Sequence, residues 1–252
     1  MKTSVVISGS GMFVPPHSIT NDELVASYND YADLTNAQHQ AQIDAGTFQP
    51  IPHSSADFIE KASGIKSRYV FVKEGTLDIH RMRPDIPERN DDELSHQAEM
   101  AVAAAKDAMQ AANKTAADID VVIVSCAYTQ RSYPAIAIEV QAALGIEGFG
   151  FDMLVACSAA TFGMHRAYEM IKSHTAKTVL VINPELVSPQ INYKDRDSHF
   201  IFGDVATAMI LEDGAQADSE HVYDVLSTHA VTSYSNNIRS NFGYMSHATD
   251  AE

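Results

Sequence analysis

The chain of 252 residues contains no tryptophan, only two cysteines, and 17 lysine and arginine residues against 33 aspartate and glutamate residues. Two cysteines, Cys126 and Cys157, cannot make a disulfide framework, and their apolar surroundings suit a reducing compartment. The formal net charge of −16 argues against binding to nucleic acid or to an anionic membrane, because either partner requires a basic face. These scarcities favour a cytoplasmic protein that binds neither.

Long hydrophobic runs are also missing. No run approaches the roughly 20 apolar residues that cross a bilayer. Residues 1–16 have one lysine and a very short apolar run before a Gly/Pro-rich turn, so they predict a first strand and not a signal peptide. The P-loop, GxGxxG after a strand, HExxH and metal-spaced Cys/His patterns are absent, so we expect no metal and no bound cofactor.

The chain does contain short apolar, β-branched runs that alternate with helical patterns. The runs lie at 4–8, 120–127, 178–183, 206–212 and 222–228. The helical patterns lie at 91–112, 134–145 and 157–174. The first has small residues, Ala98, Ala101, Ala105 and Ala108, that would let the helix press closely on a sheet. Continuous apolar character predicts strands covered on both faces, and the alternation predicts an α/β fold with a parallel or mixed sheet between helices.

Two polar stretches interrupt this alternation. Residues 29–57 and 74–90 are polar or charged and contain proline, which is typical of insertions near a surface. Neither stretch has the character of an interdomain linker, and we find no internal repeat.

Cys157 stands where an apolar run ends and a helical pattern begins. A helix N-terminus favours the thiolate, the reactive form of cysteine, and its free N–H groups can stabilise a developing oxyanion. Four small neighbours leave room for a thioester to approach: Ala156, Ser158, Ala159 and Ala160. The alternative is that Cys157 is a buried small residue, as free cysteines commonly are. Cys126 lies inside a predicted strand, and there we expect a structural role.

A general base cannot be assigned from the pattern. His165 lies eight residues along the same predicted helix, about 12 Å away, too far to reach the Cys157 sulfur. The other histidines considered lie in separate segments: His199, His221, His229 and His247.

Two stretches together resemble β-ketoacyl-acyl carrier protein synthase III, a thiolase-like condensing enzyme. They are FDMLVACSAATFGMHRAYEMIKSHTAKTVLVINPE and, after it, DRDSHFIFGDVATAMILED. Earlier stretches resemble the family in the same order: GSGMFVPPHSITNDEL, SADFIEKASGIKSRYV and ADIDVVIVSCAYTQRSYPAIAIEVQAALGI. The resemblance covers most of residues 1–230 and implies the first of two similar thiolase-like halves, with a mixed, mostly parallel sheet.

The resemblance also implies an activity. Cys157 would be acylated from acyl-CoA, and the acyl group condensed with malonyl-acyl carrier protein by decarboxylative Claisen condensation, a step of fatty-acid biosynthesis. This covalent route divides one difficult reaction into two easier ones. Acyl-CoA and acyl carrier protein are then the partners, with a homodimer as the assembly.

Four further residues acquire roles from the resemblance. Arg196 would stack on the CoA adenine, and Phe58 would cover the same ring where the family usually has tryptophan. Phe202 would line the acyl pocket, and Tyr133 would limit the pocket of the partner subunit. Each has a plainer interpretation: a surface arginine, a hydrophobic staple before a helix, a core residue and a turn or interface residue, respectively.

Some features depart from the family. Its GDGAGA stretch is GDVATA here, at 203–208, and Ala62 stands where the family often has an arginine. Residues 231–252 would begin the crossover to a missing C-terminal half that supplies the family's catalytic His and Asn, so we expect a fragment. Two other functions stay open: a related or head-to-head condensing enzyme with another acceptor, and a non-catalytic partner subunit.

Overall fold

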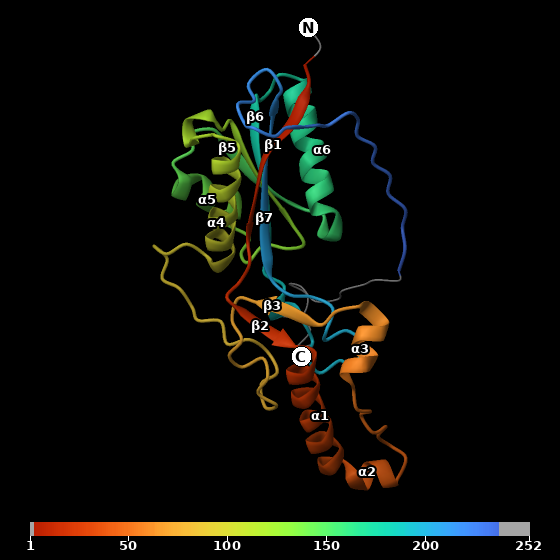
Figure 1. Ribbon diagram of the computed structural model, residues 1–252. Coiled ribbons are helices and arrows are strands. Elements are labelled where there is room, and N and C mark those ends of the chain that lie inside the picture. The colour runs from red at the N-terminus through yellow and green to blue at the C-terminus, as the bar shows by residue number, and fades with distance from the viewer. Residues whose placement is uncertain (1–2, 237–252) are drawn as a thin grey trace.

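Six strands form the central sheet of the computed structural model, which describes residues 3–236 (Figure 1). In spatial order they are β5 (Phe149–Leu154), β4 (Val121–Cys126), β6 (Thr178–Glu185), β7 (Val205–Asp213), β1 (Val5–Phe13) and β8 (Tyr223–Asp224). Strand β4 is parallel to both β5 and β6, whereas β7 is antiparallel to β6 and β1, and β8 is antiparallel to β1. The predicted mixed sheet is confirmed, with parallel pairing confined to β5, β4 and β6.

Helices cover both faces of this sheet. Helices α4 (His96–Ala111) and α5 (Ile136–Leu144) lie on one face, and α6 (Ala159–Lys172) lies on the other (Figure 1). Along β4, Val122 and Val124 join the core beneath α4 and α5, while Val121 and Ile123 join the core beneath α6. A strand buried on both faces needs apolar residues at every position, which is why the apolar runs are continuous.

Helix α4 packs unusually close to β1. Its alanines face the sheet and are fully buried, as their spacing predicts: Ala98, Ala101, Ala105 and Ala108. A Cβ placed on Gly9 would lie 2.4 Å from the carbonyl oxygen of Ala108, and one on Gly11 would lie 2.2 Å from that of Ala104. Glycine in the strand and alanine in the helix are therefore both required for this approach.

Several elements differ in extent from the sequence prediction. Helix α4 begins at His96 and not near residue 91, because the Ser95 side chain accepts a hydrogen bond from the Ala98 N–H and so caps the helix. The run at 222–228 forms only the two-residue strand β8, which pairs with Val6 and Ile7.

A second, smaller layer lies below the sheet in Figure 1. It consists of β2 (His17–Thr20), β3 (Ser67–Val70), α1 (Asn21–Gln38), α2 (Gln40–Asp44) and α3 (Ala56–Ser63). Strands β2 and β3 pair with each other, apart from the central sheet. The core of this layer includes Ile19, Leu24, Tyr28, Ile59 and Tyr193.

The polar stretch 29–57 folds largely as helix. It contains the second half of α1 and all of α2. Helix α1 begins with a capping box between Thr20 and Glu23 and buries Tyr28 and Ala32. The stretch 74–90 contains no helix or strand. Most of the predicted crossover at 231–252 lies outside the described residues. Within residues 3–236, we find no helix with the length and apolar character to cross a bilayer.

Enlarging Gly11 tests the close contact between β1 and α4. We expect Gly11→Val to lower the free energy of unfolding by about 1–3 kcal/mol, because the new side chain meets backbone atoms that cannot yield. Urea unfolding measures the change. The control is Ser10→Val, since Ser10 is exposed on the same strand. Equal stability of the two variants would contradict the packing argument.

Candidate active site

The parallel pairing of three strands brings their carboxyl ends to one edge of the sheet. Strand β4 ends at Cys126, β5 at Leu154 and β6 at Glu185. In sheets of this kind, sites form outside the carboxyl ends of the strands. Cys157 follows β5 at this edge, so the sequence prediction of a cysteine between strand and helix is confirmed.

Residues 155–158, which we call the cysteine turn, connect β5 to α6. The turn contains the 3₁₀ segment Ala156–Ser158, and Ala156 has a φ of 47°, in the left-handed region that residues with a Cβ rarely occupy. Backbone strain of this kind gathers at active sites. The turn leaves Cys157 exposed, so the alternative of a buried small residue is wrong.

The N-terminus of α6 is open beside this cysteine. Ser158 occupies the N-cap position, and no side chain forms a cap hydrogen bond there. The Ala159 N–H donates to the Ala156 carbonyl oxygen of the 3₁₀ segment, and the helix dipole adds partial positive charge at this end of α6. Such a terminus stabilises negative charge on the Cys157 sulfur or on a carbonyl oxygen bound next to it.

The cysteine turn is attached to the end of β4. The Val155 N–H donates to the Cys126 carbonyl oxygen at 3.2 Å. The Ser125 hydroxyl donates to the Ala159 carbonyl oxygen at 2.8 Å, inside the first turn of α6. Ser125 is completely buried, so this contact excludes water. The position of Cys157 therefore depends on the last residues of β4.

Cys126 itself is buried inside this edge. Its Sγ donates to the Tyr128 carbonyl oxygen at 3.1 Å, and burial raises the pKa of the thiol to about 12. The thiol therefore stays protonated near neutral pH, and the structural role predicted for Cys126 agrees with its placement.

A hollow of about 430 Å³ begins at the residue next to Cys157. Its walls come from the outer face of α6 and from residues 225–231, and they include Ser158, Phe162, His165 and His229. His165 lies two helical turns from Cys157 and 3.6 Å from the Glu169 carboxylate, so the structure joins it to that acid. The inference that His165 cannot reach the sulfur agrees with its place on α6.

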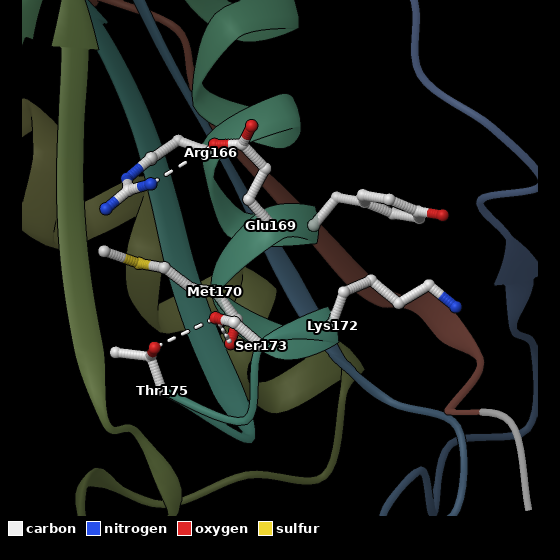
Figure 2. Close-up of a pocket in the computed structure, with 7 residues that line it drawn as sticks. Arg166, Glu169, Met170, Lys172, Ser173 and Thr175 are labelled. Carbon is white, nitrogen blue, oxygen red and sulfur yellow. Dashed lines mark hydrogen bonds and ion pairs between the residues drawn. The ribbon is translucent and has the colours of Figure 1, made fainter.

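A second hollow, shown in Figure 2, lies at the other end of α6. It has a volume of about 500 Å³. Among its lining residues, Arg166 donates a hydrogen bond to the Glu169 carboxylate, and the Ser173 and Thr175 hydroxyls are hydrogen-bonded to each other. Arg166 lies nine residues beyond Cys157, about 14 Å along the helix axis, and the other lining residues lie farther still. This hollow is separate from the cysteine site.

Arg196 and Phe58, which the sequence assigns to one adenine ring, lie in direct contact. The Arg196 guanidinium carbon is 4.1 Å from the centre of the Phe58 ring, and its Nε donates to the His53 carbonyl oxygen at 2.8 Å. Phe58 also meets Phe200 edge to face, at 6.0 Å between ring centres. A planar cation on an aromatic face is a favourable contact. Arg196 thus occupies the face of Phe58 that a flat ligand would use.

The staple interpretation of Phe58 is wrong. Phe58 lies inside α3, and its N–H donates to the N-cap residue Ser55. A hydrophobic staple instead joins the residue before the N-cap to the fourth helical residue, which is Ile59 here.

Phe202 and Tyr133 lie at the surface. Phe202 is 47% exposed, so its interpretation as a plain core residue is wrong. Tyr133 is 85% exposed, in the segment between β4 and α5. The described contacts bring neither ring to Cys157.

Two carboxylates that were not expected from the sequence organise this end of the molecule. Asp204 is buried and accepts hydrogen bonds from the Phe71, Val187 and Ser188 N–H groups and from the Ser188 hydroxyl. Glu185 accepts from the Ala127 N–H through both carboxylate oxygens, at 3.0 and 3.2 Å. The sequence feature that could have identified them is an acidic residue directly beside an apolar strand: Glu185 ends VLVINPE, and Asp204 ends FGD just before β7. Within residues 3–236, no three His, Cys, Asp or Glu side chains gather as metal ligands.

Alkylation tests the contrast between the two thiols. At pH 8 we expect iodoacetamide to modify Cys157 in the folded protein and to spare Cys126, because Cys157 is exposed and Cys126 is buried with a pKa raised to about 12. Peptide mapping by mass spectrometry identifies the modified site. Adding urea should expose the second thiol, and Cys157→Ala should abolish the native-state product. Modification of Cys126 first would contradict the placement.

Residues 151–231, which hold the cysteine turn, match the family model described as 3-Oxoacyl-[acyl-carrier-protein (ACP)] synthase III. A Pseudomonas aeruginosa protein named beta-ketodecanoyl-[acyl-carrier-protein] synthase is 53% identical over 225 residues, 89% of this chain. A beta-ketoacyl-[acyl-carrier-protein] synthase III of Granulibacter bethesdensis is 30% identical over 91% of this chain.

Solved structures agree with the sequence relatives. The crystal structure of 3-oxoacyl-[acyl-carrier-protein] synthase III from Aquifex aeolicus is similar with a TM-score of 0.60 and 26% identity, covering 87% of this chain and 55% of that one. This likeness confirms the expected thiolase-like fold. The chain spans 64% of the Pseudomonas relative and 57% of the Granulibacter relative.

Proposed function

We propose that Cys157 is the nucleophile of an acyl-transferring condensing enzyme of the 3-oxoacyl-[acyl-carrier-protein] synthase III family, whose model matches residues 151–231. One observation carries the proposal. Cys157 is an exposed thiol on a strained turn, at the open N-terminus of α6 and at the carboxyl edge of the parallel strands. This arrangement suits attack on a thioester carbonyl.

The first half-reaction follows from this geometry. The Cys157 thiolate attacks the carbonyl carbon of acyl-CoA, and the N–H groups at the start of α6 stabilise the oxyanion. The carbon–sulfur bond to CoA then breaks, CoA leaves as its thiolate and takes up a proton, and the acyl group stays on Cys157. Covalent capture of this kind gives ping-pong kinetics.

In the second half-reaction, malonyl-acyl carrier protein loses CO₂. The resulting carbanion attacks the acyl carbon, and Cys157 departs as the thiolate, releasing 3-oxoacyl-acyl carrier protein. Within residues 3–236 the structure pairs no histidine with Cys157, so the contacts described here support the first half-reaction. The complete reaction, with acyl carrier protein as its second partner, is proposed from the family.

An eight-carbon acyl group is the proposed donor. The name of the Pseudomonas aeruginosa relative specifies a β-ketodecanoyl product, which has ten chain carbons. Decarboxylative condensation adds two carbons, so the acyl group accepted by such an enzyme has eight. The 53% identity supports extending this preference to the present chain.

Acylation of the 252-residue chain tests the nucleophile. We expect octanoyl-CoA to add one acyl group to Cys157, faster than acetyl-CoA or palmitoyl-CoA does, and we expect Cys157→Ala to remain unmodified. Intact mass and peptide mapping give the amount and the site. If none of the three donors labels Cys157, the proposal is wrong; if a different length labels fastest, only the eight-carbon preference fails.

Arg196 and Phe58 are proposed to hold the CoA adenine. An aromatic ring between them needs about 7 Å, twice the usual stacking distance, whereas the guanidinium carbon now lies 4.1 Å from the Phe58 ring centre. Arg196 would therefore leave the Phe58 face and the His53 carbonyl oxygen when the nucleotide enters. Phe202 and Tyr133 keep their proposed roles at the acyl pocket.

Replacing Arg196 tests this adenine site. We expect Arg196→Ala to slow acylation by subsaturating octanoyl-CoA about 10-fold, because one stacking cation is lost. Acylation by octanoyl-N-acetylcysteamine should not change, since that thioester carries no adenine. Mass spectrometry at timed intervals measures both rates. An equal slowing with both donors would mean that Arg196 acts on the fold and not on the nucleotide.

A cytoplasmic homodimer is the proposed assembly. Strand β5 is the edge of the sheet, and exposed apolar side chains lie on it and on the segment and helix before it: Phe149, Leu154, Ile138 and Tyr133. An open edge strand is a template for pairing with a second chain. A second copy could extend the sheet by adding its own β5 beside this one.

A further inference from the structure

Glu185 occupies a position that the proposed reaction does not use. It is the last residue of β6, and its half-buried carboxylate accepts from the Ala127 N–H through both oxygens. Among the described residues, no Lys, Arg or His forms an ion pair with it. Removing a carboxylate partly from water costs desolvation free energy, and one backbone N–H donor offsets only part of that cost. This placement therefore indicates that the carboxylate serves a role.

The peptide group that Glu185 holds is the one that holds the cysteine turn. Cys126 and Ala127 share one planar peptide group, whose N–H and C=O point in opposite directions. The N–H donates to Glu185, and the C=O accepts from the Val155 N–H at 3.2 Å. Val155 is the first residue of the cysteine turn. Rotation of this peptide would therefore move the turn that carries Cys157.

A second side chain near the end of β6 supports the neighbouring peptide. Buried Asn183 donates from Nδ2 to the Ser125 carbonyl oxygen at 2.8 Å. The Ser125 hydroxyl in turn donates to the Ala159 carbonyl oxygen in α6. Hence β6 fixes the end of β4 at two successive peptides, and β4 fixes both ends of the cysteine turn.

We propose that Glu185 is a positioning residue for Cys157, whose ionised carboxylate orients the peptide between Cys126 and Ala127 and through it the cysteine turn. The inference deepens the proposed function and rests on it, since a fixed thiol matters for attack on an acyl thioester. Accurate placement of a reacting group is a large component of catalysis.

The charge of Glu185 gives this inference a pH dependence. Burial raises the pKa of Glu185 to about 7, and the Ala127 N–H opposes that rise. An ionised carboxylate is a stronger acceptor than a neutral acid, so the Ala127 peptide is held most firmly above pH 7 and less firmly as the pH falls through 7. Protonation of Glu185 should therefore loosen the cysteine turn.

Other titratable groups surround this carboxylate. The Cys126 thiol and the Tyr128 hydroxyl face it from β4 and the following segment, and burial raises the pKa of both, that of Cys126 to about 12. Asp152 of β5 acts on Cys126, and Asp204 acts on Tyr128. The native protein and a Glu185 variant both contain these four groups. A comparison of the two proteins therefore isolates the effect of the Glu185 charge.

Glu185→Gln tests the proposal. The amide has the shape of the acid but carries no charge, and it turns one acceptor into a donor that faces the Ala127 N–H. The measurement is the rate of Cys157 acylation by octanoyl-CoA in variant and native chains between pH 6 and pH 8.5, because the ratio cancels titrations common to both. We expect a ratio of about 0.1 at pH 8.5 that rises towards 1 at pH 6.

Control variants separate positioning from general effects. Glu147→Gln removes an exposed charge from the loop between α5 and β5, and the ratio of variant to native rate should be 1 at every pH. Glu185→Asp keeps the charge but withdraws it by one methylene, and it should recover part of the rate at pH 8.5. If Glu185→Gln does not fold, Glu185→Asp replaces it in the experiment. Its ratio of variant to native acylation rate at pH 8.5 should then fall below 1, but less far than the ratio expected for Glu185→Gln.

The outcomes distinguish this inference from the proposed function. If the native chain is acylated and the Glu185→Gln ratio is 1 throughout, or is equally low throughout, the inference is overturned and the proposed function stands. If the native chain is not acylated, the proposed function fails, and amide hydrogen exchange decides the structural part. Faster exchange of Val155 in Glu185→Gln at pH 8 would then support the inference, and unchanged exchange would overturn it.

Discussion

The rest of the structure depends on the parallel pairing of β4 with both β5 and β6. Parallel strands end at the same edge, so residues that follow three separate apolar runs meet there. Cys157 arrives after β5, Ala127 after β4 and Glu185 at the end of β6. Strands β4 and β6 are buried on both faces, so packing beneath α4, α5 and α6 fixes their register and with it the place of the site.

Much of this arrangement follows from the sequence. Continuous apolar runs predicted the buried strands, and the small residues of α4 predicted its close approach to the sheet. The junction of run and helix predicted the location of Cys157, although its exposure depends on the left-handed φ of Ala156, which no propensity indicates. The stretch 29–57 was expected only as an insertion near a surface, and its helical structure was not foreseen because polar residues surround the few buried positions of α1, such as Ala32.

Contacts between a side chain and a distant backbone group were beyond sequence reasoning. The Ala127 N–H lies 58 positions from Glu185, and their hydrogen bond exists only because β4 and β6 pair in one particular register. Asp204 accepts from the Phe71 N–H, 133 positions away, because the end of β3 lies against the residue before β7. Composition and periodicity describe which face is apolar, whereas the partners of a polar group depend on how the strands are aligned.

The contact between Arg196 and Phe58 has a consequence for selectivity. If Phe58 holds the adenine ring as proposed, an incoming ring has to compete with the Arg196 guanidinium, a group that the protein itself supplies. Rings that stack weakly would then gain too little to displace it. The affinity of the proposed site for CoA would be a net quantity, reduced by the fraction of molecules in which Arg196 rests on the Phe58 ring. Selectivity of this kind comes from the protein's own contact as well as from the fit of the ligand.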